Sequence, residues 1–185
     1  MNPIDELLAE HEAVKTTLKI LKRIGEDVAK SGKIANPEHL AQILDFLITF
    51  VDRCHHSKEE EQLFPALEEV GVSREGGPVG VMLKEHQQGR ALLAEMKTAS
   101  DQSKSGDKAA TQNLIQHANN YITLLEFHID KENNVLFPMA AKHLSESKMV
   151  ELKKGFDRIE EDKIGAGKHE YYHQMLDALK KEYLS

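Results

Sequence analysis

Two histidine–glutamate pairs stand out because each can present two metal-binding side chains together. Glu59 follows His55 by four residues, and Glu132 follows His128 by the same spacing. On a helix, residues four apart are neighbours, with Cβ atoms about 5–6 Å apart. Each pair can therefore offer an imidazole nitrogen and a carboxylate oxygen to the same metal ion.

The two pairs belong to a weak internal repeat. Residues 55–65 read HHSKEEEQLFP and residues 128–138 read HIDKENNVLFP, so that the two Leu-Phe-Pro triplets align. A Glu-His dipeptide precedes each pair, at Glu10-His11 and at Glu85-His86. Two segments of matched layout predict a pseudo-twofold arrangement in which equivalent residues meet at the axis.

Apolar residues three and four apart predict the helices that would position these side chains. The first helix opens at Pro3 and ends near Gly32, the second opens at Asn36-Pro37, and loops are expected at 71–78 and 100–107. A polar stretch follows Ser145, and a last amphipathic helix is expected over about 167–184. The prediction is an all-α, up-down four-helix bundle with an additional C-terminal helix. We expect one domain, residues 1–185, with a core at about 4–143 and an extension at about 146–185.

All the chemically interesting side chains fall on the apolar stripes of these helices. Four imidazoles and two carboxylates are thereby aimed at one core: His11, His55, Glu59, His86, His128 and Glu132. Buried carboxylates without partners would cost several kcal/mol each, and no basic residue on the stripes can serve them all. Cations solve this problem. Six ligands from four helices suit two metals, and mixed imidazole and carboxylate ligation suits iron better than manganese or zinc.

With these residues in place, the sequence resembles the hemerythrin-like (HHE cation-binding) family over roughly residues 4–143. The resemblance implies that the six residues are the metal ligands and that Glu59 and Glu132 bridge. It also implies a cofactor of two iron ions, Fe²⁺ or Fe³⁺, with an oxo or hydroxo group as the third bridge.

The sequence departs from the invertebrate oxygen carriers of this superfamily, which offer five histidines. Two of theirs lie four apart on the third helix, whereas Arg90 occupies the position four after His86 here. The fifth histidine is therefore absent or comes from elsewhere. His169, Tyr172 and His173 on the last helix are candidates for an additional ligand or for packing behind the ligands. The chain also lacks the short cysteine-containing N-terminal domain of the iron–sulfur repair members.

The remaining polar residues near the motifs are given structural interpretations. His56 lies about 100° from His55 around an α-helix, so it is expected at the surface or behind the ligands. Glu60 and Glu61 are expected on a solvated face. Cys54 is expected to fill a helix contact, with a redox role as the alternative. Pro65 and Pro138 should bend or end their helices.

The composition excludes several classes of function. The net charge of -7 and the lack of a basic stripe exclude a nucleic-acid partner. No apolar run is long enough to span a membrane, and the N-terminus does not resemble a signal peptide. Cys54 is the single cysteine, so that no internal disulfide can form and a reducing cytoplasm is the expected location.

Three functions remain open for such a centre: reversible O2 binding or sensing, reduction of NO or breakdown of peroxide, and iron delivery for iron–sulfur cluster repair. The expected partners are a small diatomic ligand or peroxide, together with an external reductant or a partner protein. Tyr172 near the metal would favour peroxide chemistry. We expect an O2-, NO- or peroxide-reactive protein, with iron donation to damaged clusters as the alternative, and whether it is an enzyme stays open.

Overall fold

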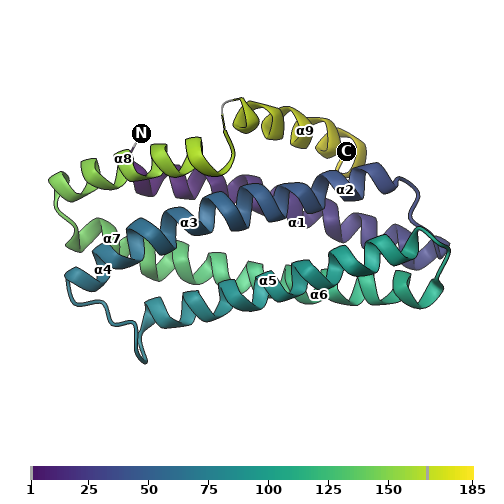
Figure 1. Ribbon diagram of the computed structural model, residues 1–185, viewed down its shortest axis with the longest axis horizontal. Coiled ribbons are helices and arrows are strands. Elements are labelled where there is room, and N and C mark those ends of the chain that lie inside the picture. The colour runs from purple at the N-terminus through teal and green to yellow at the C-terminus, as the bar shows by residue number, and fades with distance from the viewer. Residues whose placement is uncertain (1, 166) are drawn as a thin grey trace.

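The computed structural model describes residues 2–165 and 167–185 and consists of helices packed side by side. Four long helical rods run up, down, up and down (Figure 1). The first rod is α1 (Pro3–Ser31), and the third is α5 (Pro78–Ser103). The second and fourth rods are built from several consecutive segments. The predicted all-α bundle is confirmed.

The second and fourth rods each change from α-helix to the wider π-helix and back. The second comprises α2 (Pro37–Asp45), the π-helix Phe46–His55, α3 (His56–Lys58), the π-helix Glu59–Leu63 and α4 (Phe64–Glu69). The fourth comprises α6 (Lys108–Lys131), the π-helix Glu132–Leu136 and α7 (Phe137–His143). Pro65 and Pro138 follow the π-helical turns without ending their rods, so the expectation that they end a helix is wrong.

Local sequence explains where the rods begin and end. The side chains of Asn2, Asn36 and Asp107 accept hydrogen bonds from the first free backbone N–H groups of their helices. Gly32 ends α1 in the left-handed conformation, with φ of 73°, and its N–H donates to the carbonyl of Val28. The helix α5 runs past the expected loop boundary at Ser100 to Ser103.

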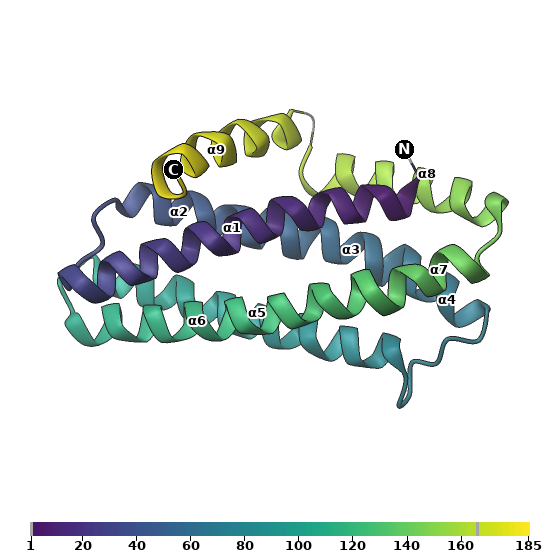
Figure 2. The same ribbon diagram turned by 180° about the vertical axis from the view of Figure 1, so that it is seen from behind.

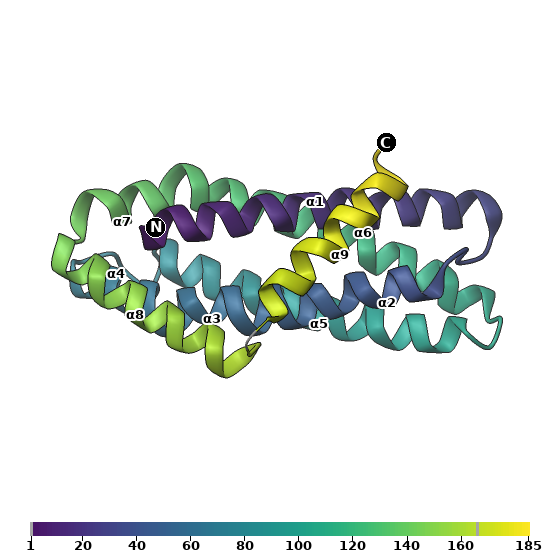
Figure 3. The same ribbon diagram turned by 90° about the horizontal axis from the view of Figure 1, so that it is seen from above.

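The C-terminal extension forms two helices instead of the expected polar stretch and single helix. They are α8 (Glu146–Lys163) and α9 (Lys168–Tyr183), and Ser145 caps α8 by accepting from the N–H of Lys148. Both lie on the face formed by α1 and the second rod, opposite the α5–α6 side (Figures 2 and 3). At Gly155 a Cβ would lie only 2.3 Å from Oε1 of Gln62, so the glycine permits the close contact of α8 with the second rod.

Two apolar clusters fill the bundle, one on either side of its polar centre. The larger holds Val14, Leu18, Leu47, Tyr121 and Leu125, with much of α9 packed on it. The smaller holds Leu7, Leu63, Phe64, Leu136 and Phe137, with α8 packed on it. Between them lie buried histidines and glutamates. None of the helices in the described ranges is long and apolar enough to cross a membrane.

Candidate metal centre

The six side chains predicted as ligands meet at one place in the bundle. The first and third rods contribute His11 and His86, and the second and fourth contribute the two histidine–glutamate pairs. Each of the six is at most 2% exposed. The π-helical turns lie at these positions, where the second rod carries His55 and Glu59 and the fourth carries Glu132. Such turns are frequent at functional sites in helices.

The histidines form two pairs, one in each half of the centre. The Nε2 atoms of His11 and His55 lie 3.1 Å apart, and those of His86 and His128 are separated by the same 3.1 Å. Each pair of nitrogens is thus close enough to share one metal ion. We call these two sets the His11/His55 half and the His86/His128 half.

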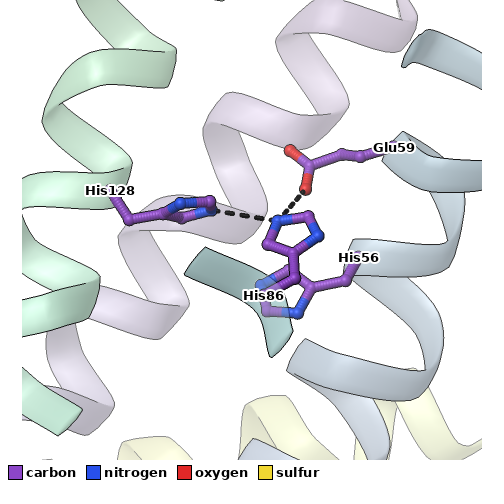
Figure 4. A group of neighbouring side chains, drawn as sticks. All are labelled: His56, Glu59, His86 and His128. Atoms are coloured by element: carbon purple, nitrogen blue, oxygen red, sulfur yellow. Dashed lines mark hydrogen bonds and ion pairs between the residues drawn. The ribbon is translucent and has the colours of Figure 1, made fainter. Parts of the chain in front are cut away.

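The two carboxylates reach both halves. Glu59 places Oε1 3.5 Å from Nε2 of His55 and Oε2 3.4 Å from Nε2 of His86. Glu132 places Oε2 3.2 Å from Nε2 of both His11 and His128. Figure 4 shows Glu59 directed at His86, with His128 alongside. Each carboxylate is therefore positioned to bridge two metals, as the sequence predicts for this pair.

The outer nitrogen of each histidine is fixed by a hydrogen bond. Nδ1 of His11 donates to Asn133 and Nδ1 of His55 donates to Glu10, each over 2.7 Å. Nδ1 of His86 donates to Glu60 over 2.7 Å, and Nδ1 of His128 donates to Glu85 over 2.9 Å. Because the acceptor oxygens hold the proton on Nδ1, the lone pair of Nε2 is directed into the centre. Metal-ligating histidines show this arrangement.

The buried carboxylates show that a cation fits here. All four oxygens of Glu59 and Glu132 are buried and accept no hydrogen bond from the described residues. Burial raises the pKa of Glu59 well above its ordinary value, and the charge of Glu132 adds to the shift. Burial also penalises the charge of Glu132, but His128 and His11 hold its pKa well below the ordinary value. Metal ions would compensate both carboxylates at once.

His56 is buried in the centre, so the expectation that it lies at the surface is wrong. It is 3% exposed and stacks on His86, with ring centroids 3.8 Å apart. The expected angle from His55 assumed an α-helix, whereas the second rod is π-helical up to His55. The wider turn brings successive residues closer in angle, so that both histidines face the interior. Nothing in the apolar spacing signals this change.

Glu60 also differs from its expected place on a solvated face. It accepts hydrogen bonds from Nδ1 of His86 and from Nη2 of Arg90, the latter over 2.6 Å. Arg90 also donates to Asp52 and so neutralises this outer pair of carboxylates, not the bridging ones. Glu61 is exposed, as expected, and pairs with Lys163.

The three candidates on the last helix have hydrogen bonds or exposure outside the six-residue cluster. Nδ1 of His169 donates to Glu160 over 3.1 Å, and the hydroxyl of Tyr172 donates to Asp45 over 2.9 Å. His173 is exposed. In the described ranges, no metal-binding group contains either histidine. The structure therefore assigns α9 a packing role over α1 and the second rod.

A buried lysine that the sequence did not indicate lies next to the centre. Lys58 is fully buried, and its Nζ lies 2.8 Å from Glu6, 2.5 Å from Glu10 and 3.1 Å from Glu160. Burial disfavours its charge, but Glu10 and its other partners raise its pKa above the ordinary value. Since Glu10 also holds His55, the lysine connects α8 to the ligands.

Cys54 fills a helix contact, as predicted. It is 1% exposed and belongs to the larger apolar cluster. Burial raises the pKa of its thiol to about 12, so the thiol stays protonated near neutral pH. A redox role would need the thiolate, which this environment disfavours.

Fold and site together define a helical-bundle protein with a buried histidine–carboxylate centre suited to metal. The chain belongs to the hemerythrin HHE cation binding domain family, which matches residues 2–140. The match covers the four rods and all six predicted ligands, so cation binding is the general property to expect of this centre.

The chain is also similar to several curated proteins. It is 33% identical over 147 residues to the iron-sulfur cluster repair protein YtfE of Edwardsiella ictaluri, a match covering 75% of this chain and 66% of that protein. It is 30% identical over 148 residues to YtfE of Cronobacter sakazakii, with the same coverage of 75% and 66%. An uncharacterized protein of Mycobacterium tuberculosis is 27% identical over 165 residues, covering 87% and 62%. The chain thus spans just under two thirds of the length of these relatives.

Proposed function

We propose that the chain binds two iron ions in this centre and donates iron for the repair of damaged iron–sulfur clusters. The observation that carries the proposal is the pair of buried carboxylates, because Glu59 and Glu132 each approach imidazoles of both halves. The similarity to proteins named for cluster repair supports the use of the iron.

The residues divide the work of holding iron. His11 and His55 would hold one ion, His86 and His128 the other, and the two carboxylates both. Imidazole and carboxylate donors suit iron, and helical bundles commonly place such donors on facing helices. The hydrogen bonds at Nδ1 keep every imidazole in the tautomer that binds metal, so the site needs little rearrangement on loading.

The donor set also supports release of the iron. The candidate metal-binding groups in the described residues contain nitrogen and oxygen donors and no cysteine. Iron–sulfur clusters are held by thiolates, which bind iron more strongly in that setting. A damaged cluster with free thiolates can therefore compete for iron held by imidazoles and carboxylates. The proposal places this exchange in the cytoplasm, with the damaged protein as partner.

The test is transfer of iron from the loaded chain. The chain is loaded with Fe²⁺, freed of excess metal and mixed with an enzyme whose [4Fe–4S] cluster has been damaged by peroxide. We expect recovery of enzyme activity and ready loss of iron to a mild chelator. The matched control is Glu61→Gln, an exposed change beside the centre that should transfer iron normally. Iron that resists the chelator and fails to restore activity would contradict repair.

A second function, reaction with O2, NO or peroxide, is favoured by one observation. Phe137 stacks on His11 with centroids 5.2 Å apart, and Phe64 stacks on His86 at 5.7 Å, so apolar rings cover the centre. An apolar surrounding suits small neutral ligands, and turnover would need an external reductant. Stoichiometric consumption of NO or peroxide by the reduced protein, with iron retained against the chelator, would favour this function over repair.

A further inference from the structure

The two halves of the centre are built from equivalent residues of the internal repeat. His11 corresponds to His86, His55 to His128 and Glu59 to Glu132, each from the equivalent rod. The residues that accept from their Nδ1 atoms correspond as well. One position breaks the equivalence: His56 follows His55 in one copy, whereas Ile129 follows His128 in the other.

His56 has the same hydrogen-bonding arrangement as the four predicted histidine ligands. Its Nδ1 donates to Oδ1 of Asp52 over 3.4 Å, and Asp52 is in turn held by Nε of Arg90 over 2.7 Å. Its Nε2 is buried and has no hydrogen-bond partner among the described residues. A buried nitrogen left unpaired costs about 1–3 kcal/mol, which a bound cation would offset.

The imidazole of His56 belongs to one half only. It lies with Glu59, His86 and His128 in a group whose donor atoms are all within 4.8 Å of one another. The group around His11 and His55 contains Glu59 and Glu132 but not His56. Figure 4 shows His56 entering beside His86 from the same rod as Glu59. The His86/His128 half therefore offers three imidazoles, and the His11/His55 half offers two.

The equivalent position on the other side is apolar and adjoins a cavity. Ile129 is 2% exposed and lines a cavity of about 400 Å³ between α1 and the fourth rod. Leu18 and Asn133 line the same cavity, and Asn133 is the residue that holds His11. A small molecule in this cavity is thus separated from the His11/His55 half by a single layer of side chains.

We propose that His56 is a seventh protein ligand, bound to the metal of the His86/His128 half, and that small exogenous ligands bind at the metal of the His11/His55 half. This inference rests on the proposed two-iron centre and adds to it an inequality between the two metals. The metal with three imidazoles has its positions filled by protein, whereas the metal beside Ile129 keeps a position for an outside ligand.

The test exchanges the two unequal residues. In iron-loaded protein, Mössbauer spectra should show two distinct quadrupole doublets of equal area. His56→Ile makes the halves alike, so the doublets should converge or the iron content should fall from about two toward one per chain. Ile129→His adds the missing imidazole, so azide binding to the oxidised protein, followed by absorption, should weaken by about tenfold or more. His56→Ile should keep azide binding at the remaining His11/His55 iron.

Unchanged doublets and full iron content in His56→Ile would overturn the seventh ligand. Unchanged azide binding in Ile129→His would overturn the assignment of the open position. Circular dichroism checks folding, and His56→Gln replaces His56→Ile if the latter does not fold, with the same expected loss. His117→Gln is a matched control, because His117 pairs with Glu95 outside the centre and should change neither spectrum. Wild-type chain without iron would refute the proposed function itself, which distinguishes that failure from failure of this inference.

Discussion

The two halves of the centre share their ligand types but differ in their surroundings. Behind His55, the acceptor Glu10 is 4% exposed and pairs with the fully buried Lys58. Behind His128, the equivalent Glu85 is 15% exposed and pairs with Lys131, which is 38% exposed. The helix α8 accounts for part of the difference, because its Glu160 completes the partners of Lys58.

A second difference runs in the opposite direction. The acceptor behind His86 is the carboxylate of Glu60, whereas the acceptor behind His11 is the neutral amide of Asn133. A carboxylate acceptor makes the imidazole a stronger donor to metal than an amide does. The repeat thus supplies equal ligands, while single substitutions and the helices outside the repeat make the halves unequal.

The largest expected effect comes from removing what the halves share. Glu59→Ala or Glu132→Ala should each lose most of the bound iron, because each carboxylate serves both metals. Elemental analysis of iron per chain measures the loss, with the exposed Glu161→Ala as control. Normal iron content in both variants would mean that neither carboxylate bridges and that the comparison of two halves has no shared element.

The next effect separates the two lysines. Lys58→Met leaves three carboxylates together without a cation, and breaking a buried pair in this way costs about 3–5 kcal/mol. Lys131→Met removes an equivalent but partly exposed pair and should cost under about 1 kcal/mol. Urea denaturation of both variants measures the free energies of unfolding. Similar losses would show that burial under α8 does not distinguish the halves.

Much of the centre was predictable because the repeat and the helical period report the same faces. The spacing of His55, Glu59, His128 and Glu132, with His11 and His86 on the apolar stripes, placed six side chains in one core, and the structure brings them together. Their role as ligands stays a prediction. The capping residues and Gly32 likewise marked helix ends that the structure confirms.

The remainder depended on features that sequence periodicity does not contain. The burial of His56 follows from a π-helical turn, which no residue pattern announced. The partners of Lys58 come from α1 and α8, and helical spacing within one rod cannot report them. The helix α8 itself buries only Leu152, Gly155, Phe156 and Ile159 along 18 residues, so its apolar signal is weak.

A smaller effect tests the charge behind His86. Glu60→Gln keeps an oxygen that can accept from Nδ1 but removes the negative charge, so we expect iron binding in the His86/His128 half to weaken by about tenfold. A chelator competition measures the affinity, and Mössbauer spectra identify the half that empties first. Glu61→Gln is the matched control. Equal weakening in both would assign the effect to net charge instead of the hydrogen bond.

The smallest expected effect lies at the outer end of the same network, where His169 joins α9 to Glu160 of α8. The hydrogen bond to Glu160 raises the pKa of His169 above its ordinary 6.5, and His169 helps to lower the pKa of Glu160 to about 2. A raised histidine pKa contributes stability that is full below about pH 6.5 and is lost as the pH rises through the folded-state value. His169→Gln should therefore lower the free energy of unfolding by a few tenths of a kcal/mol at about pH 6 and by nothing at about pH 9. Urea denaturation at the two pH values measures this, and iron content should not change, because α9 contributes no residue to either half. A loss of iron in this variant would show that the C-terminal helices hold the ligands as well as cover them.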